Sequence, residues 1–257
     1  MNRTYYRSIF ISDLHLGFRG ANTSSLLAFL KSVRCDYLYL VGDIFDLWAM
    51  KKKIWWDSNC TAIIRQILKM AKYGTKVIYL PGNHDDAIRS FLPIAFGTEI
   101  EIVDESLHIT TNGTRYIIFH GDRFDTIVGH MKWLALLGSV LYDWLLMGND
   151  ILHKIRLRLG YHSYWSLAAY LKHKAKRAVS FIKDFETAVV HYAMTHQCDG
   201  AIVGHIHHAE IKIVHIGDRE VIYANCGDFV ETLSALVENS TGELQLIYCH
   251  NMRSTHI

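Results

Sequence analysis

The sequence predicts an α/β protein in which two sheets stack between outer helices. In the first third of the chain, short apolar runs alternate with stretches of helical periodicity, the order expected of βαβ units and a partly parallel sheet. Toward the end, strands with two-residue alternation follow one another. Half of the 257 residues are apolar, and at roughly 150 residues per domain this length suggests one core plus an insertion.

The βαβ region is predicted to run from the first strand to the third. The strands are Ser8–Ser12, Tyr37–Val41 and Lys76–Leu80, and the helices between them are Ser24–Val33 and Asn59–Lys72. Within the second helix, Ile63, Ile67 and Met70 repeat at helical spacing, which indicates one buried face.

The later strands are separated by turn signals. Asn112-Gly113, Gly217-Asp218 and Thr241-Gly242 are dipeptides that favour tight turns. The strands predicted here are Glu99–Val103, Leu107–Thr111, Tyr116–Phe119, Ala201–Val203, Glu210–His215, Val221–Ala224, Ser234–Glu238 and Leu244–Cys249.

One region, 126–183, shows only helical patterns and is predicted to be an insertion into a core of 1–125 and 184–257. Its part Ile151–Lys183 holds eight Lys and Arg and no acid, a charge of +8. The rest of the chain therefore holds 19 of the 27 basic residues and all 25 acidic ones, a balance of −6. One helix face in and after this part is apolar, through Leu167, Leu171, Ala175, Ala178, Ile182, Phe185 and Val189.

Composition excludes several classes of protein. Disorder and low-complexity structure do not fit half-apolar composition with only two prolines. Five cysteines without CxxC spacing argue against a disulfide framework and a thiolate zinc site, which favours a reducing cytoplasm. The N-terminus lacks the order of a signal peptide, and no apolar stretch reaches the roughly 20 residues of a membrane-spanning helix.

Five short segments rich in Asp, His and Asn follow predicted strands. They are Ser12-Asp13-Leu14-His15, Gly42-Asp43-Ile44-Phe45-Asp46, Gly82-Asn83-His84-Asp85, His120-Gly121-Asp122 and Gly204-His205-Ile206-His207. Functional sites gather at the carboxyl ends of strands in open α/β sheets. These segments offer enough oxygen and nitrogen ligands for two divalent cations, a recurring solution for phosphate-ester hydrolysis, with Asp43 as the natural bridging carboxylate. Their glycines permit close backbone approach.

The order D-x-H, G-D-x-x-D, G-N-H-D, H-G-D, G-H-x-H resembles the calcineurin-like metallophosphoesterase superfamily. That resemblance implies a four-layer α/β/β/α sandwich with a helical cap insertion. It places one metal on Asp13, His15, Asp43 and His207, and a second on Asp43, Asn83, His120 and His205. It makes His84 the catalytic histidine at the phosphate and Asp46 its carboxylate partner. Taken alone, Asp46 could equally be a helix cap.

Within the superfamily, the chain is similar to the UDP-2,3-diacylglucosamine pyrophosphatase group. The similarity rests on Phe10–Gly17, Gly42–Trp48, the tail Asn225–Glu231 with Ala235–Glu238, and the basic helical insertion. One departure is His84, where established members typically carry Arg, so a sister branch with another substrate stays open.

This second resemblance implies cleavage of UDP-2,3-diacylglucosamine to UMP and 2,3-diacylglucosamine 1-phosphate in lipid A biosynthesis. The expected mechanism is activation of a bridging hydroxide by two metals. Oxygen and imidazole ligands suit Mn²⁺, Fe²⁺ or Zn²⁺, and the absence of cysteine ligands favours Mn²⁺. The expected location is the cytoplasm of a bacterium, peripheral on the inner face of its membrane.

The basic insertion has three interpretations: a solvated charged face, a substrate cap, or an attachment to an anionic membrane. Candidate substrate-binding residues are Lys172, Lys176, Arg177 and Trp48. All six tryptophans lie in Trp48–Trp56 or Trp133–Trp165, which suits a lipid interface and core packing equally.

Two other functions remain alternatives. A nucleotide or nucleic-acid phosphodiesterase would use the same metal site, although the apolar character of the +8 segment disfavours nucleic acid as a partner. A non-catalytic scaffold that binds a membrane or protein would keep the fold, although a full ligand set argues against it. The remaining histidines, such as His108 and His196, are expected to lack partners, and His208 to point away from the site.

Overall fold

The computed structural model describes residues 3–125 and 167–249, and the side chains of helix residues 167–178 lie outside that description. Met1–Arg123 with Val189–Ile257 form one compact unit and Phe124–Ala188 a second. Most of the predicted insertion, 126–166, lies outside the described residues, so the assignment of 126–183 as a cap stays a prediction.

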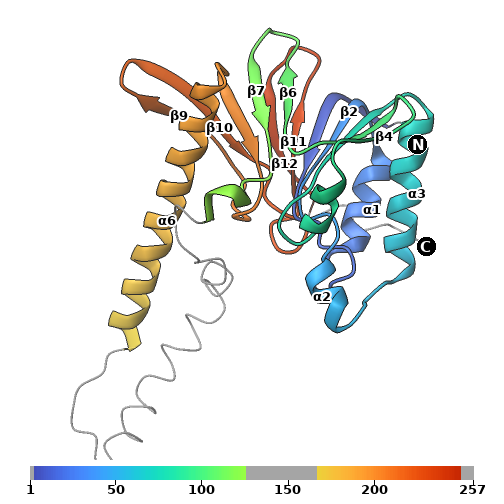
Figure 1. Cartoon of the computed structure of the whole chain (residues 1–257), viewed down its shortest axis with the longest axis horizontal. Coiled ribbons are helices and arrows are strands. Elements are labelled where there is room, and N and C mark those ends of the chain that lie inside the picture. Colours follow the sequence, from blue (N-terminus) through green and yellow to red (C-terminus); the bar gives the residue numbers. More distant parts are fainter. Residues whose placement is uncertain (1–2, 126–166, 250–257) are drawn as a thin grey trace, which may run out of the picture. The chain divides into compact units, whose positions relative to one another are not determined.

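A seven-stranded sheet in the first unit contains the predicted βαβ strands (Figure 1). Its order is β12-β11-β1-β2-β3-β5-β4. β1, β2, β3 and β5 run parallel, and β11, β12 and β4 are antiparallel to their neighbours. The bounds are β1 Thr4–Ile11, β2 Val33–Val41, β3 Lys76–Leu80, β4 Ile94–Phe96, β5 Ile100–Ile102, β11 Ser234–Glu238 and β12 Leu244–Tyr248.

A five-stranded sheet has the order β6-β7-β8-β10-β9. β7, β8 and β10 are parallel, whereas β6 and β9 pair antiparallel at its edges. The bounds are β6 Ser106–Ile109, β7 Arg115–Ile118, β8 Gly200–Val203, β9 Glu210–Ile216 and β10 Arg219–Asn225. The three predicted turn dipeptides lie between β6 and β7, β9 and β10, and β11 and β12, as expected.

The helices are α1 Thr23–Ser32, α2 Leu47–Lys52, α3 Ser58–Lys72 and α6 Leu167–Thr195, with short 3₁₀ helices η1 Asp86–Phe91 and η2 Asp122–Phe124. A side-chain oxygen caps the N-terminus of each of the first three helices. Asn22 accepts from the Ser25 amide, and Asp57 accepts from the Cys60 amide, so each satisfies a backbone donor that the first turn leaves open. Among the described residues, no helix is long and apolar enough to cross a membrane.

Alternation along the strands creates two cores. In β2, Leu38 and Leu40 face α1 and α3, while Tyr39 and Val41 face the second sheet, because successive side chains of a strand point to opposite faces. Ile118 of β7 and other residues of the second sheet complete the core between the sheets. From Val189 onward, α6 supplies the fourth layer, where the Tyr192 and Phe119 rings meet at 5.0 Å. The α/β/β/α sandwich is confirmed.

The structure differs from the sequence prediction mainly at polar ends. β1 and β2 each begin four residues earlier than predicted, since Thr4 and Val33 already pair in register. The first side chains of β1 are exposed or half-buried, and in β2 the exposed Arg34 and Asp36 alternate with the buried Val33 and Cys35. The continuous apolar run detects only the fully buried second half of each strand. Helix α2 and strand β4 were not predicted, because both are short and lack buried residues. All five cysteines are free and buried.

Candidate metal centre

The five predicted segments meet at the carboxyl ends of strands from both sheets. β1, β2 and β3 lead to Asp13, Asp43 and Asn83, and β7 and β8 lead to His120 and His205. Parallel neighbours end at the same edge of a sheet, so their following loops converge. Gly42 and Gly82 permit this convergence, because a Cβ at either position would collide with His120, and at Gly82 also with Asp43.

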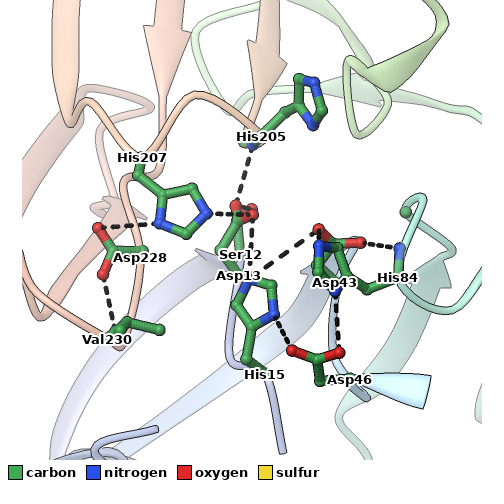
Figure 2. Close-up of polar contacts among 12 residues, drawn as sticks. Ser12, Asp13, His15, Asp43, Asp46, His84, His205, His207, Asp228 and Val230 are labelled. Carbon is green, nitrogen blue, oxygen red and sulfur yellow. Dashed lines mark hydrogen bonds and ion pairs between the residues drawn. The ribbon is translucent and has the colours of Figure 1, made fainter. Parts of the chain in front are cut away.

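Left-handed backbone is concentrated in these residues, since within 3–125 and 167–249 the other non-glycine residues with positive φ are Gln197 and Leu233. Five of the seven predicted metal ligands are non-glycine residues in the left-handed region, with φ values of 53° at Asp13, 47° at His15, 52° at Asp43, 72° at His205 and 53° at His207. Such residues are uncommon and their conformations unfavourable unless the surroundings hold them. Backbone bonds do so here: the Asp13 amide donates to Gly42, and the His15 amide to the Asp43 carbonyl. The backbone is therefore locally strained at these residues, and the strained conformation directs their side chains into the site (Figure 2).

Asp13, His15 and His207 form the first cluster (Figure 2). Asp13 Oδ1 lies 3.1 Å from His207 Nε2 and 3.8 Å from His15 Nε2. The other oxygen, Asp13 Oδ2, accepts from the His205 amide at 2.9 Å and from the Ser12 hydroxyl. One carboxylate oxygen is therefore fixed by the backbone while the other faces two imidazoles.

Asp43 stands at the centre of a second cluster with His120 and Asp13. Its Oδ2 lies 3.4 Å from His120 Nε2 and 4.0 Å from His15 Nε2, so it faces both groups of ligands. His205 joins this side, because its Nδ1 is 3.2 Å from His120 Nε2. The His120 Nδ1–H donates to the Val41 carbonyl at 2.9 Å, which leaves Nε2 as the ring nitrogen facing Asp43.

Asp46 contacts both His15 and His84. Its Oδ2 is 3.2 Å from His15 Nδ1, and its Oδ1 is 2.9 Å from His84 Nδ1. The same Oδ1 accepts from the Ala49 amide at 2.8 Å and begins α2. The cap and the histidine partner were alternatives in the sequence, and the structure shows both. With Nδ1 held by Asp46, the His84 Nε2 lies 4.0 Å from Asp43 Oδ2.

The buried carboxylates of Asp13 and Asp43 stabilise positive charge on the groups around them. Burial alone would raise the pKa of Asp13, but the His207 and His120 rings outweigh it and lower that pKa below its usual range. Burial alone would lower the pKa of His120, but Asp43 and Asp13 raise it to about 10. Asp13 likewise raises the pKa of His207 to about 9, against burial. Nearby opposite charges therefore dominate desolvation.

Several buried polar atoms of the site make no hydrogen bond within the described part of the chain. They are Asp13 Oδ1, His15 Nε2, His207 Nδ1 and both amide atoms of Asn83. Buried polar groups are nearly always paired, so exceptions in one cluster point to a missing partner. Carboxylate oxygens, imidazole nitrogens and an amide oxygen are ligands that suit divalent cations. The residues present fit a metal centre.

Sequence reasoning missed two supporting residues, Asp228 and Arg89. Asp228 is buried, accepts from the Val230 amide at 2.7 Å and places Oδ2 3.8 Å from His207 Nδ1. Arg89 donates to both oxygens of Asp122, at 2.6 and 2.9 Å, and to the Pro81 carbonyl at 2.7 Å. Asp228 lies in the tail Asn225–Glu231 that supported the resemblance, which was its one signal.

The remaining candidates divide by position. Trp48 lies against His84 with ring centroids 4.4 Å apart and is 45% exposed. Lys172, Lys176 and Arg177 belong to α6, but their side chains lie outside the described residues. His208 is exposed and faces Glu210 at 3.9 Å.

The expectation that His108 lacks partners was wrong. Its Nε2 lies 2.8 Å from Glu238 Oε2, and its Nδ1 lies 3.1 Å from the Tyr39 hydroxyl. His196 also contacts a neighbour, the Tyr192 carbonyl, at 2.9 Å. These partners lie on other strands or one helical turn away, so alternation within a single strand does not reveal them.

One known protein family matches most of this chain. The family profile described as calcineurin-like phosphoesterase matches residues 6–209, which include every predicted ligand. The chain belongs to the calcineurin-like phosphoesterases. It is a phosphoester hydrolase, and the family implies divalent metal ions. The non-catalytic scaffold is set aside.

Curated relatives of this phosphoesterase carry a more specific name. A UDP-2,3-diacylglucosamine hydrolase of Aliivibrio fischeri is 24% identical over 89% of this chain and 92% of that protein. One of Vibrio cholerae is 24% identical over 95% and 98%. Among solved structures, a dimetal phosphatase from Danio rerio is similar at TM-score 0.45 and 12% identity, over 95% of this chain and 98% of that one.

Proposed function

We propose that this phosphoesterase hydrolyses the diphosphate of UDP-2,3-diacylglucosamine, releasing UMP and 2,3-diacylglucosamine 1-phosphate. The observation that carries the proposal is the full-length similarity to hydrolases of that name, 24% over 92% of the Aliivibrio fischeri protein. The clustering of the metal-type donors at the carboxyl ends of strands from both sheets supports a hydrolase of phosphate esters. The reaction would belong to lipid A biosynthesis, on the inner face of a bacterial cytoplasmic membrane.

The proposed ligand sets follow the two clusters. Asp13, His15 and His207 would hold one ion, and Asn83, His120 and His205 the other, with Asp43 shared because it faces both. Bound divalent ions, with Mn²⁺ favoured, would supply Lewis acidity and lower the pKa of a water molecule. Their charge would replace the protons that Asp43 and Asp13 otherwise attract to His120 and His207.

The chain's own residues would then orient the reacting groups. Asp46 holds Nδ1 of His84 and of His15, so each ring presents Nε2 toward the cluster in a fixed tautomer. Burial opposes protonation of His84, but the hydrogen bond to Asp46 raises its pKa, which favours a ring that donates to a phosphoryl or leaving oxygen. His84 would thus be the catalytic acid and Asp46 its positioning residue.

Substrate recognition would involve residues around this edge. Trp48, half-exposed beside His84, is placed to contact the group next to the phosphates. Lys172, Lys176 and Arg177 would contact phosphate or sugar from the basic part of the proposed cap.

The decisive test compares two substrates. Purified protein with Mn²⁺ should convert UDP-2,3-diacylglucosamine to UMP and the sugar 1-phosphate, followed by mass spectrometry of both products. Asp43→Ala and His120→Ala should abolish turnover. If the wild-type protein left this lipid intact yet cleaved bis(4-nitrophenyl) phosphate, the substrate assignment would fail while the hydrolase class stood.

A nucleotide phosphodiesterase is the second candidate. The observation that favours it is His84 at a position where the sequence resemblance leads one to expect Arg, because a histidine can transfer a proton to a leaving oxygen and an arginine cannot, which favours a different leaving group. Faster turnover of a nucleotide diester than of the lipid substrate would support this candidate.

A further inference from the structure

A basic and aromatic stretch of the core is exposed beside the metal centre. Every residue of 51–58 is exposed, and the sequence from Lys51 reads Lys-Lys-Lys-Ile-Trp-Trp. We call Phe18, Arg19 and Lys51–Trp56 the α2 surface, because it extends from the end of that helix.

The backbone joins the two parts of the α2 surface. The Trp55 amide donates to the Gly17 carbonyl at 3.1 Å, an isolated antiparallel bridge. Phe18 and Arg19 therefore follow directly on the strand segment that pairs with Trp55. The Arg19 guanidinium lies 5.3 Å from the Trp55 ring centroid, and Lys53 Nζ lies 4.3 Å from it. Cations thus flank one exposed indole.

The apolar side chains of this surface are poorly buried. Ile54 is 61% exposed, and Phe18 and Trp55 are each 41% exposed. Trp56 is 40% exposed as well, but its ring stacks on Phe45 and its Nε1–H donates to Thr61. Trp56 anchors the stretch, while Phe18, Ile54 and Trp55 present apolar area to the outside.

The charge of the α2 surface is positive throughout. Arg19, Lys51, Lys52 and Lys53 provide four cations. The neighbouring acid, Asp57, is already engaged as the cap of α3, accepting from the Cys60 amide at 2.8 Å and from Thr23 at 2.8 Å. Cations around exposed Trp and Ile match the headgroup region of an anionic bilayer, where amphipathic aromatic rings and basic side chains are both favoured.

The α2 surface is covalently tied to the catalytic edge. Asp46, the partner of His15 and His84, caps the N-terminus of helix α2, and the helix ends in the lysines. Gly17, which pairs with Trp55, comes two residues after His15. Docking through this surface would therefore bring the metal centre to the layer in which a diacylated substrate resides.

We propose that the α2 surface docks this protein on an anionic lipid bilayer, with Phe18, Ile54 and Trp55 in the headgroup region and Arg19 with Lys51–Lys53 on lipid phosphates. The docking deepens the proposed function and rests on it only for its purpose, access to a bilayer-resident substrate. The exposed Ile54 beside these cations favours lipid over nucleic acid. Single-stranded nucleic acids are bound through cations and stacking aromatic rings, and a branched aliphatic side chain contributes to neither.

The test is co-sedimentation of the full chain with phosphatidylcholine vesicles containing phosphatidylglycerol, without any substrate. Affinity should rise with the anionic lipid fraction and fall with salt. Changing Lys51, Lys52 and Lys53 to Gln should weaken binding by roughly 100-fold, from about fivefold per lysine. Ile54→Ser with Trp55→Ser should weaken binding even at low salt.

Matched controls separate docking from charge, folding and catalysis. Lys31, Lys69 and Lys72 are exposed on α1 and α3, and their triple change to Gln removes the same charge but should leave vesicle affinity within about twofold. Hydrolysis of bis(4-nitrophenyl) phosphate should be unchanged in every variant. Equal vesicle affinity of the two triple variants would overturn the proposal, as would tighter binding to single-stranded RNA than to anionic vesicles.

Discussion

One carboxylate of Asp46 connects the start of a helix to two histidines of the metal centre. It accepts from the Ala49 amide and from Nδ1 of His15 and His84. The hydrogen bond from the Ala49 amide fixes the position of the Asp46 carboxylate, and the carboxylate fixes the orientation of the two imidazole rings. This coupling makes Asp46 a positioning residue whose effects on stability and activity are separable.

Asp46→Asn should lower kcat by about 10- to 100-fold, the usual range for the partner of a ligating histidine. The amide can still cap α2, but it no longer attracts the Nδ1 protons with a full charge. The measurements are kcat on bis(4-nitrophenyl) phosphate at saturating Mn²⁺ and metal affinity by calorimetry. Asp57→Asn is the control, because Asp57 caps α3 in the same way, at 2.8 Å from the Cys60 amide. Equal losses of kcat and metal affinity in the two variants would show that Asp46 acts only as a helix cap.

At the level of elements, Arg89 ties two loops of the site together. It lies in η1, bonds both oxygens of Asp122 after β7, and also bonds the Pro81 carbonyl after β3. These loops carry His120 and Asn83, which would share one ion. The planar guanidinium donates several hydrogen bonds in a fixed geometry and so contacts both loops at once. The ammonium group of a lysine cannot make the same paired hydrogen bonds to a carboxylate.

Arg89→Lys should therefore weaken binding of one of two metal ions by about tenfold while the fold is retained. Titration calorimetry with Mn²⁺ resolves the two sites, and circular dichroism checks the fold. Arg123→Lys serves as the comparison, since Arg123 contacts Asp104, Glu105 and Tyr192. A uniform change at both sites would contradict the role given to Arg89.

Glu238 connects β11 of one sheet to β6 of the other. Burial would raise its pKa, but hydrogen bonds from His108 and Ser8 and further contacts lower it to about 2, against an ordinary 4.5. Because the folded pKa is the lower one, the ionised carboxylate stabilises the fold fully above pH 4.5. That contribution is lost as pH falls from about 4.5 to 2.

Glu238→Gln should therefore be less stable than the wild type at pH 7, and the gap should narrow steadily below pH 4.5. Urea unfolding at pH 7, 5, 4 and 3 measures the difference in free energy. A gap that stays constant across this range would show that the ionisation of Glu238 contributes nothing.

At the scale of the whole molecule, the metal centre joins the two sheets. Its donors follow β1, β2 and β3 on one side and β7 and β8 on the other. A cation bound there would hold both sheets in the native state only, so binding free energy adds to folding stability.

Chelation with EDTA should accordingly lower Tm by about 5–10 °C per site, at a free-metal concentration 100 times Kd before chelation, from about 2.7 kcal/mol and 2–4 °C per kcal/mol. Scanning calorimetry with and without Mn²⁺ measures the shift. Asp43→Asn should show a clearly smaller shift, because Asp43 faces both clusters. An identical shift in wild type and variant would place the stabilising ion elsewhere.

The sequence by itself determined the strands and helices of the βαβ region and the candidate residues of the metal centre. Periodicity reveals which strands are buried, and parallel strands must end at one edge, so the Asp, His and Asn residues after them had to converge. Only the tertiary structure decided that five of these residues adopt left-handed backbone and that Asp46 serves two histidines. It alone paired His108 with Glu238 and Arg89 with Asp122, because such contacts join distant segments through burial and charge that no local pattern records.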